Sequence, residues 1–349
     1  MITFADLPTD REWKSGIDHF DPQACGLLPD SLPARPRIHR FTETSMTTTH
    51  AAATSFSRPF LPFRTALVAA LTMSCVALAS AQTVRVGSKN FTEQFVLAEL
   101  YAQAFEAAGI KVERKTNLGG TLIAHKALEE KQIDFYPEYT GTMLLVVLKA
   151  APMTDKQAVY DKVKTAYAAN GLTVLAQAPM NNTYVMVMKP EVAAKYKLAT
   201  LSDLTRVGKE LKLGAGPEFR DRKDGLPGLK ATYGMEFKED LQLAIGLRYQ
   251  ALKNDQIDVV NGYSTDGMIA AMKLTRLKDD KNLWPPYFLA PVVRKEALDA
   301  NPKLAEVTNK VSALLDDATM ARLNYLVDGE KEEPKDVAKA FLKEKGIVR

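Results

Sequence analysis

Cysteine and histidine are scarce in this 349-residue chain. Both cysteines, Cys25 and Cys75, stand near the amino terminus, and His125 is the only histidine beyond His50. A protein that loses this amino-terminal segment retains no disulfide and no thiol chemistry. Because no group of Cys and His has metal-ligand spacing, the sequence predicts no metal site and no cofactor.

The chain also lacks an excess of charge of one sign. Its 46 basic and 42 acidic residues are interspersed, without the basic stripe that a phosphate backbone requires, so nucleic acid is excluded as a partner. With 46% hydrophobic and 25% charged residues, the composition is that of a globular protein. The length allows a sizeable core and more than one domain.

Recognisable catalytic motifs are missing as well. His125 lies inside a predicted helix, and nothing beside it marks it as a general base. Ser264-Thr265-Asp266 is not a nucleophile elbow, and Gly119-Gly120 lacks the Lys-Ser/Thr of a phosphate-binding loop. We therefore expect no enzymatic activity. Turnover of a bound compound would favour the alternative, an enzyme.

A secretory signal peptide is predicted for residues 46–81. Arg58 and Arg64 precede an apolar run from Ala66 to Ala79, and Ala79-Ser80-Ala81 matches an A-x-A cleavage site. The run is short for a membrane span, which favours cleavage over anchoring. The mature chain is then expected to begin near Gln82, in the periplasm.

Two features near this segment need separate interpretation. Thr72-Met73-Ser74 before Cys75 is a poor match to a lipobox, which favours a soluble product over a lipoprotein. Residues 1–45 are rich in Pro and Asp and would place a signal peptide inside the chain. We interpret them as a non-native or disordered extension, with translation starting at Met46.

Beyond the signal peptide, strands and helices alternate, which predicts an α/β protein with parallel βαβ units. Asn90, with Glu93 three residues on, resembles a capping box at the start of the first helix. The first predicted elements are, in order, a strand (84–86), a helix (90–108), a strand (111–116), a helix (121–131) and a strand (133–136).

Part of this pattern occurs twice. Val84-Arg85-Val86-Gly87 is echoed by Leu211-Lys212-Leu213-Gly214, and a longer echo has nearly the same offset. Both echoes favour two similar α/β lobes that arose by duplication. The alternative is that the echoes are a coincidence within one sequence. The longer echo pairs Ala127-Leu128, Gln132-Ile133-Asp134 and Tyr139-Thr140 with Ala251-Leu252, Gln256-Ile257-Asp258 and Tyr263-Ser264.

Four tyrosines are candidates for one binding site. Tyr139 and Tyr263 follow strands of the two predicted lobes, where ligands of open α/β sheets bind, and Tyr184 and Tyr287 lie in loop-like settings. A trimethylammonium group has no N–H to donate, so a protein holds it with aromatic faces worth about 0.5–2 kcal/mol each. For each tyrosine taken alone, the alternative to ligand binding is an ordinary packing role.

A ligand that also carries a carboxylate needs cationic or hydroxyl donors at the other end of the site. Lys89 follows the first strand of one lobe, and Arg220 and Arg222 follow the equivalent strand of the other. Solvated surface charges are the alternative interpretation for each of them.

The ordered motifs of the mature chain resemble the osmoprotectant-binding proteins of glycine betaine, carnitine and choline ABC importers. The resemblance runs from about Thr83 to the carboxyl terminus. The motifs are Gly87-Ser88-Lys89-Asn90-Phe91-Thr92-Glu93-Gln94, Asn117-Leu118-Gly119-Gly120-Thr121, Tyr136-Pro137-Glu138-Tyr139-Thr140-Gly141-Thr142, Asn181-Asn182-Thr183-Tyr184, Asp224-Gly225-Leu226-Pro227-Gly228-Leu229, Tyr263-Ser264-Thr265-Asp266-Gly267, and Asp279-Asp280-Lys281 through Pro285-Pro286-Tyr287.

The resemblance implies a two-lobed periplasmic-binding-protein fold of type II-like architecture, with the ligand cleft between the lobes. Lobe 1 is expected to comprise residues 82–180 and 290–349, and lobe 2 residues 181–289. The family's site residues carry over to an aromatic box of Tyr139, Tyr184, Tyr263 and Tyr287, and to carboxylate contacts from Lys89, Thr142 and Arg222. Asn182, where some relatives have Asp, is a further possible contact and is neutral here.

The implied function is capture of a quaternary ammonium osmoprotectant by a periplasmic, monomeric binding protein, which delivers it to a membrane permease with its ATPase. An amino acid or polyamine is the alternative ligand, although a primary amine needs carboxylate acceptors more than rings. A sensory or scavenging role is another alternative. The motifs do not choose among betaines, carnitine and choline, and we expect choline, which lacks a carboxylate, to leave Lys89 and Arg222 unpaired.

Overall fold

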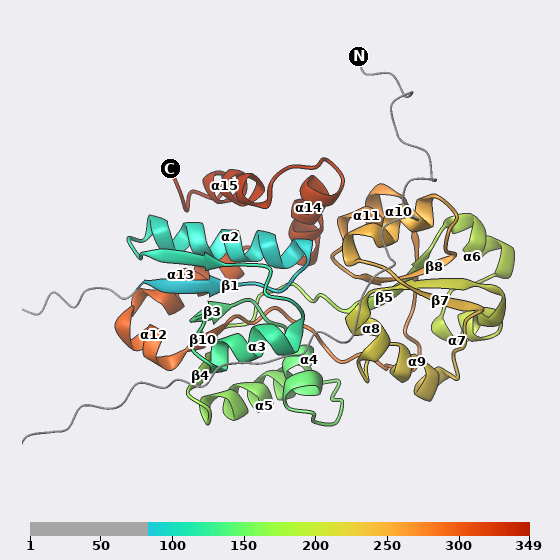
Figure 1. The fold of residues 1–349 in the computed structure, drawn as a ribbon, viewed down its shortest axis with the longest axis horizontal. Coiled ribbons are helices and arrows are strands. Elements are labelled where there is room, and N and C mark those ends of the chain that lie inside the picture. Colours follow the sequence, from blue (N-terminus) through green and yellow to red (C-terminus); the bar gives the residue numbers. More distant parts are fainter. Residues whose placement is uncertain (1–82) are drawn as a thin grey trace, which may run out of the picture. The chain divides into compact units, whose positions relative to one another are not determined.

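The computed structural model describes residues 83–349, which belong to one compact unit with two five-stranded sheets (Figure 1). The predicted extension and signal peptide lie outside the described residues. We call each sheet with its covering helices a lobe. The two-lobed α/β fold is thus as predicted, while the boundaries at residues 181 and 290 remain a prediction. No helix of the described part is long and apolar enough to cross a membrane.

The sheet of lobe 1 has the strand order β2-β1-β3-β10-β4. β1 pairs in parallel with β2 and β3, as the βαβ pattern predicts, whereas β10 is antiparallel to β3 and β4. The strands are β1 (Val84–Gly87), β2 (Val112–Lys115), β3 (Phe135–Tyr136), β4 (Leu172–Val174) and β10 (Val292–Arg294). The helices before the chain crosses are α2 (Thr92–Ala107), α3 (Thr121–Glu129), α4 (Thr140–Thr142) and α5 (Lys156–Ala168), with a π-helical turn at Met143–Val147.

The sheet of lobe 2 repeats this arrangement with the order β7-β6-β8-β5-β9. β6 is parallel to β7 and β8, and β5 is antiparallel to β8. The strands are β5 (Tyr184–Met188), β6 (Lys212–Ala215), β7 (Glu239–Gln242), β8 (Val259–Tyr263) and β9 (Thr275–Leu277). The helices are α6 (Pro190–Tyr196), α7 (Leu201–Thr205), α8 (Pro217–Asp221), α9 (Leu226–Tyr233), α10 (Arg248–Lys253) and α11 (Gly267–Ala271), with 3-10 turns at Gly208–Glu210 and Ile245–Leu247.

The sequence echo corresponds to the same interactions in both lobes. Asp134 accepts a hydrogen bond from the backbone N–H of Arg85 at 2.9 Å, and Asp258 accepts one from Lys212 at 2.8 Å. Each aspartate thereby joins the starts of two neighbouring parallel strands, β1 and β3 in lobe 1 and β6 and β8 in lobe 2.

The glycine at the end of the first strand in each echo also has a common role. A Cβ added to Gly87 would lie 2.5 Å from Ile133, and one added to Gly214 would lie 2.4 Å from Ile257. Glycine therefore lets the echoed isoleucine of each lobe pack directly on the strand backbone.

The predicted capping box at Asn90 and Glu93 is wrong. Helix α2 begins at Thr92 with Phe91 as its N-cap residue, and no side chain caps it. The Glu93 carboxylate instead accepts hydrogen bonds from residues far away in the sequence, described below. Tertiary partners thus outweigh a local cap worth about 1 kcal/mol.

The carboxyl-terminal segment completes lobe 1. The helices there are α12 (Lys295–Ala300), α13 (Lys303–Ser312), α14 (Asp317–Asp328) and α15 (Pro334–Glu344), and residues 329–333 separate the last two. Figure 1 shows α15 lying alongside α2. Buried apolar residues from both helices, such as Leu97, Leu100 and Phe341, share one core.

Two segments connect the lobes and pair with each other. Asn181 and Phe288 form an isolated antiparallel β-bridge, and the backbone N–H of Asn182 donates to the carbonyl of Tyr287 at 3.0 Å. A second bridge joins Tyr139 to Leu289. Predicted site residues therefore lie on, or are bonded to, the crossing segments.

Candidate functional site

All eight predicted site residues line one cavity. Two further residues, Phe91 and Glu218, complete its lining. The lining residues are Lys89, Phe91, Tyr139 and Thr142 of lobe 1, Asn182 on a crossing segment, Tyr184, Glu218, Arg222 and Tyr263 of lobe 2, and Tyr287 beside the second crossing.

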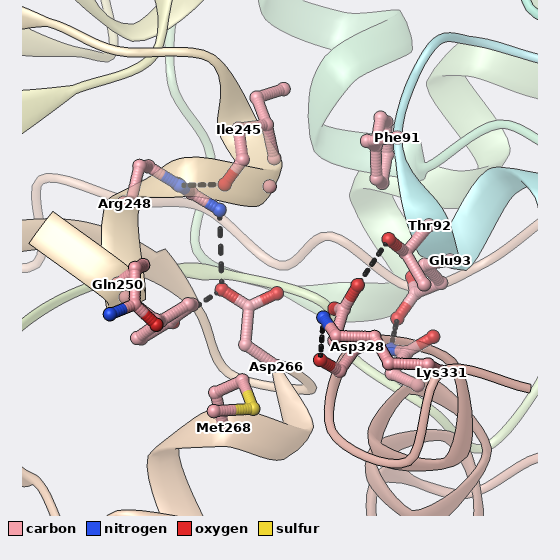
Figure 2. A pocket seen from close by; sticks show the side chains of 13 residues that line it. Phe91, Thr92, Glu93, Ile245, Arg248, Gln250, Asp266, Met268, Asp328 and Lys331 are labelled. Atoms are coloured by element: carbon pink, nitrogen blue, oxygen red, sulfur yellow. Dashed lines mark hydrogen bonds and ion pairs between the residues drawn. The ribbon is translucent and has the colours of Figure 1, made fainter. Parts of the chain in front are cut away.

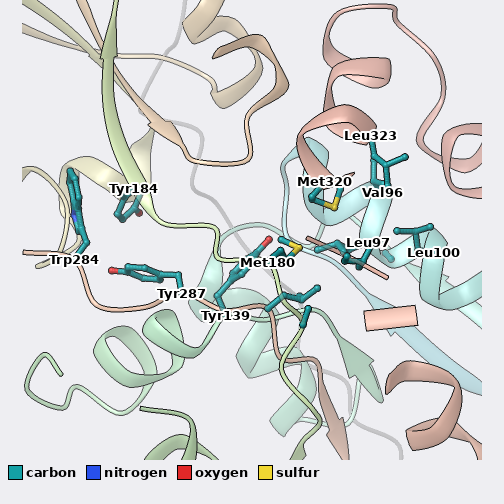
Figure 3. Packing of buried hydrophobic residues seen from close by; sticks show 14 of the residues in the cluster. Val96, Leu97, Leu100, Tyr139, Met180, Tyr184, Trp284, Tyr287, Met320 and Leu323 are labelled. Carbon is teal, nitrogen blue, oxygen red and sulfur yellow. The ribbon is translucent and has the colours of Figure 1, made fainter. Parts of the chain in front are cut away.

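Tyr184 is the centre of an aromatic cluster. Its ring stacks on Tyr263 with centroids 5.4 Å apart, and it meets Tyr287 at 6.0 Å and Phe219 edge-on at 4.9 Å. Trp284 lies behind it at 6.0 Å. Figure 3 shows Tyr184, Tyr287 and Trp284 grouped together, with Tyr139 nearby. The predicted tyrosines thus come together around one space.

Burial keeps the tyrosine hydroxyls of the cavity protonated. It raises the pKa of Tyr263 to about 12 and the pKa values of Tyr139, Tyr184 and Tyr287 well above the ordinary value. The rings therefore stay neutral phenols near neutral pH, and their faces offer the negative potential of an aromatic quadrupole.

A glycine makes room for one of these rings. A Cβ at Gly141 would lie 2.6 Å from the Tyr287 ring and 2.8 Å from the carbonyl oxygen of Pro286. The short helix α4 can therefore pack against the second crossing only because residue 141 has no side chain. Thr140 strengthens this contact, because its hydroxyl bonds the backbone on either side of Tyr287.

Lys89 lies in the cavity wall as a buried ion pair. Its ammonium is 2.6 Å from Glu138, whose side chain is fully buried, and it stands 4.8 Å from the centroid of the Tyr139 ring. Such a pair compensates for the loss of hydration only when the geometry is close.

Arg222 forms the corresponding pair in lobe 2. It binds Asp224 through two nitrogens, at 2.8 and 2.5 Å, and its guanidinium lies 5.3 Å from the centroid of Tyr184. Asp224 also accepts a hydrogen bond from the Tyr287 hydroxyl. The expectation that a ligand without a carboxylate leaves Lys89 and Arg222 unpaired is therefore wrong, because Glu138 and Asp224 already pair with them.

Comparison with known proteins places this chain in a family. A family model described as the substrate-binding domain of an ABC-type glycine betaine transport system matches residues 82–344. The chain belongs to this family. The resemblance seen in the sequence is thus confirmed, and so is the predicted class, a solute-binding component of an ABC importer.

Individual relatives agree with this assignment. The glycine-betaine-binding protein of Pseudomonas aeruginosa is 40% identical over 298 residues, which are 81% of this chain and 96% of that protein. The carnitine transport binding protein OpuCC of Listeria monocytogenes is 36% identical over 267 residues, 75% and 87% of the two chains. A crystal structure of a glycine betaine/carnitine/choline ABC transporter component has a TM-score of 0.65 and 34% identity, and the match covers 76% of this chain and 99% of that one.

Beneath the cavity, Glu93 joins four parts of the chain. One carboxylate oxygen accepts hydrogen bonds from Tyr139 at 2.6 Å and Asn182 at 2.7 Å. The other accepts from Thr265 at 2.5 Å and Asn324 at 2.9 Å. These donors come from lobe 1, a crossing segment, lobe 2 and helix α14. Glu93 therefore fixes two cavity residues relative to both lobes.

No basic side chain among residues 83–349 forms an ion pair with Glu93, and burial raises the pKa of its carboxyl. Between the ordinary value of 4.5 and the raised pKa, the folded protein holds a proton that the unfolded chain has lost. The free energy of unfolding therefore falls as pH rises through this window. Urea denaturation at a series of pH values above 4.5 should show this slope, and Glu93→Gln should reduce it.

A matched control for this prediction is Glu106→Gln. Its hydrogen bonds to Arg114 lower the pKa of Glu106, so this group titrates below the window. The control should leave the slope unchanged. An unchanged slope in Glu93→Gln would contradict the assignment. Asp328, whose pKa is also raised by burial, accounts for a residual slope in the variant.

A direct contact joins the lobes across the cavity. Glu218 of α8 accepts hydrogen bonds from the backbone N–H and the hydroxyl of Thr121, at 2.5 and 3.2 Å. Thr121 is the first residue of α3, whose N-terminus favours a negative charge. A Cβ at Gly120 would meet the Glu218 carboxylate, so glycine permits this approach.

A second cavity lies between the lobes on the other side of Phe91 (Figure 2). Arg248, Asp266 and Met268 of lobe 2 face Thr92 and Asp328 of lobe 1 there. Arg248 lies 3.4 Å from Asp266, and Thr92 donates to Asp328 at 2.7 Å. Its lining is mostly charged and polar, and Phe91 and Tyr249 are its only aromatic rings among the described residues. It offers no aromatic box.

Sequence reasoning missed three residues of the site. Phe91 was not among the predicted site residues, yet its ring stacks on Tyr263 at 5.5 Å in the cavity wall. Glu218 lies four residues before the predicted site residue Arg222. An acidic residue at that position gave no sign of a contact with the other lobe. Glu93 was assigned to a cap. The one sequence signal for a further role of Glu93 was its place in the motif from Gly87 to Gln94.

Proposed function

We propose that this protein captures a small quaternary ammonium compound, with its trimethylammonium group enclosed by Tyr139, Tyr184, Tyr263 and Tyr287. The observation that carries the proposal is that these rings, from both lobes and a crossing segment, line a single cavity. Phe91 adds a fifth ring. Several rings together supply the affinity that a cation without N–H groups needs.

The charges around the cavity support a cationic head group. The two cations, Lys89 and Arg222, are balanced by Glu138 and Asp224, and Glu218 adds a further carboxylate to the lining. Because both lining cations are already paired, their charge does not oppose the entry of a positively charged ligand.

A betaine carboxylate would contact the opposite end of the cavity. Lys89 and Arg222 retain N–H groups beyond those used on Glu138 and Asp224, and Thr142 offers a hydroxyl in the same lining. Closure of the lobes around the ligand would bring both sets of contacts together.

We further propose that the protein acts outside the cytoplasm, in the periplasm, as a monomer without enzymatic activity. It would deliver its ligand to a membrane permease that works with an ATPase. The names of the relatives, which refer to glycine betaine and carnitine binding, support this role.

Calorimetric titration of the purified chain with glycine betaine, carnitine, choline and glycine tests the proposal. We expect binding of at least one methylated ammonium compound and none of glycine, because glycine presents a primary ammonium that the rings leave without acceptors. Binding of glycine or a polyamine, with no response to any methylated compound, would refute the proposed ligand class.

A further inference from the structure

Helix α3 of lobe 1 has no cap of its own at its amino-terminal end. Its N-cap position is occupied by Gly120, which has no side chain to accept a hydrogen bond. The backbone N–H of Thr121 is one of the donors that an α-helix leaves unsatisfied in its first turn. Helix α5 of the same lobe shows the usual solution, because its N-cap residue Asp155 accepts from Ala158 at 2.7 Å.

The missing cap of α3 is supplied by the other lobe. The Glu218 carboxylate accepts from the backbone N–H of Thr121 at 2.5 Å and from its hydroxyl at 3.2 Å. Thr121 is only 1% exposed, so solvent does not replace this acceptor while the lobes are together. The negative charge also interacts favourably with the positive end of the helix dipole. We call this contact the interlobe cap, and it exists only while the two lobes touch.

Gly120 is the residue that admits the carboxylate. The three atoms nearest to a Cβ added at this position all belong to the Glu218 side chain, and the nearest is its Oε1. The backbone of Gly120, with φ −77° and ψ −177°, is extended and open to any residue. An alanine there would therefore leave the backbone of lobe 1 unstrained and displace only the carboxylate.

Glu218 also has a second partner within its own lobe. One oxygen of its carboxylate lies 3.6 Å from Arg222, and its side chain is 35% exposed. When the lobes separate, the carboxylate can turn to Arg222 and to solvent, so it is not left as a buried charge without a partner. The interlobe cap is thus exchangeable, as a contact that forms and breaks with each closure must be.

We propose that Glu218 is a positioning residue that holds the lobes closed by capping helix α3 across the cleft, and that this contact sets how long the ligand is retained. The inference rests on the proposed function and goes beyond it, because the rings recognise the ligand whereas the interlobe cap controls its release. The open form lacks this contact, so ligand entry does not depend on it.

Stopped-flow kinetics on the full chain, with glycine betaine, choline and carnitine as probes, test this inference. In Glu218→Ala, release should be about tenfold faster, as expected for loss of a charge-assisted hydrogen bond, and association should stay within about twofold. Gly120→Ala keeps Glu218 but displaces its carboxylate, so it should accelerate release by a similar factor. The double variant should release no faster than either single variant, because both changes remove the same contact.

An effect of Glu218 on the ligand itself must be separated, because this residue also lines the cavity. Thr121→Pro removes both donors and leaves Glu218 unchanged, and proline is tolerated at the first position of a helix. We expect this variant to release the probes as fast as Glu218→Ala. The matched control is Asp155→Ala, which removes a helix cap confined to one lobe and outside the cavity lining, and which should leave release unchanged.

The kinetic results can overturn the inference in three ways. Fast release in Glu218→Ala, with unchanged release in Gly120→Ala and Thr121→Pro, would show that Glu218 acts on the ligand directly. Unchanged release in Glu218→Ala, or slower association in place of faster release, would show that the contact does not hold the closed form. Additive effects in the double variant would show that Gly120 and Glu218 act independently.

Failure of every methylated ammonium probe to bind the unmodified chain would overturn the proposed function but not the interlobe cap. Hydrogen exchange at the Thr121 amide of the ligand-free chain then tests the contact by itself. We expect exchange to be about tenfold faster in Glu218→Ala, because the N–H loses its acceptor. Equal exchange rates in the two proteins would overturn the interlobe cap as well.

Discussion

Replacement of Tyr184 by leucine is expected to weaken binding of a quaternary ammonium ligand by about thirtyfold or more. A desolvated cation–π contact contributes about 2 kcal/mol, and every 1.4 kcal/mol changes affinity tenfold. Tyr184 stacks on Tyr263 and meets Tyr287 edge-on, so its loss also loosens the neighbouring rings. Calorimetric titration with choline and glycine betaine measures the effect.

Tyr184→Phe is the matched control for this prediction. The hydroxyl of Tyr184 forms no hydrogen bond with another described residue, unlike the hydroxyls of Tyr139 and Tyr287, which bond to Glu93 and Asp224. Phenylalanine retains the ring, so affinity should stay within about threefold. If leucine were tolerated as well as phenylalanine, the cavity would hold its ligand without the aromatic faces.

Arg222→Gln is expected to lower the free energy of unfolding by about 3–5 kcal/mol, the usual cost of removing one partner of a buried ion pair. The Asp224 side chain is only 3% exposed, so the variant leaves a charge without its cation. Burial raises the pKa of Asp224, but the bonds from Arg222 outweigh it and keep that pKa below the ordinary 3.8. Urea denaturation near pH 7 measures the loss.

The same chain offers a matched control in Arg220→Gln. Arg220 pairs with Asp240 at 3.0 Å, but both side chains are about a third exposed, so this change should cost less than about 1 kcal/mol. The double variant Arg222→Gln/Asp224→Asn should recover part of the loss because no buried charge remains. Equal losses in Arg222→Gln and Arg220→Gln would show that the buried pair does not stabilise the fold.

The acid dependence of the Arg222–Asp224 pair has a defined sign. Because the pKa of Asp224 is lowered in the folded state, its stabilising contribution is present above 3.8 and is lost as pH falls through the lowered value. This window lies below the one assigned to Glu93, whose raised pKa acts in the opposite direction. The two carboxylates can therefore be distinguished in one pH series.

The sequence predicted eight residues that line one cavity, because they follow strand ends and chain crossings in recognisable motifs. Tyr139 and Tyr263 stand after β3 and β8, at the same place in the two lobes. The alternation of apolar residues predicted β1, and glycine and proline predicted the ends of helices. These are local signals, and the structure retains them.

Long-range pairing was beyond reach for a physical reason. In the sequence, Asn90 stands three residues before Glu93 and is the expected capping partner of that glutamate. Nothing in the sequence shows that four distant donors converge on the Glu93 carboxylate instead. Likewise Glu138 and Asp224 lie within the quoted motifs, yet their pairing with Lys89 and Arg222 depends on how loops fold in three dimensions. Burial of charge cannot be read from residue types alone.

The position of β10 has a consequence for the order in which the chain can fold. β10 lies between β3 and β4, so β4 has no partner in the first sheet until residues 292–294 have been synthesised. The strands of the second sheet, in contrast, all lie between residues 184 and 277. As the chain emerges from its amino-terminal end, the second lobe has all its strands while the first still lacks β10 and α15. The sheet that the chain begins first is therefore the one that it can complete last.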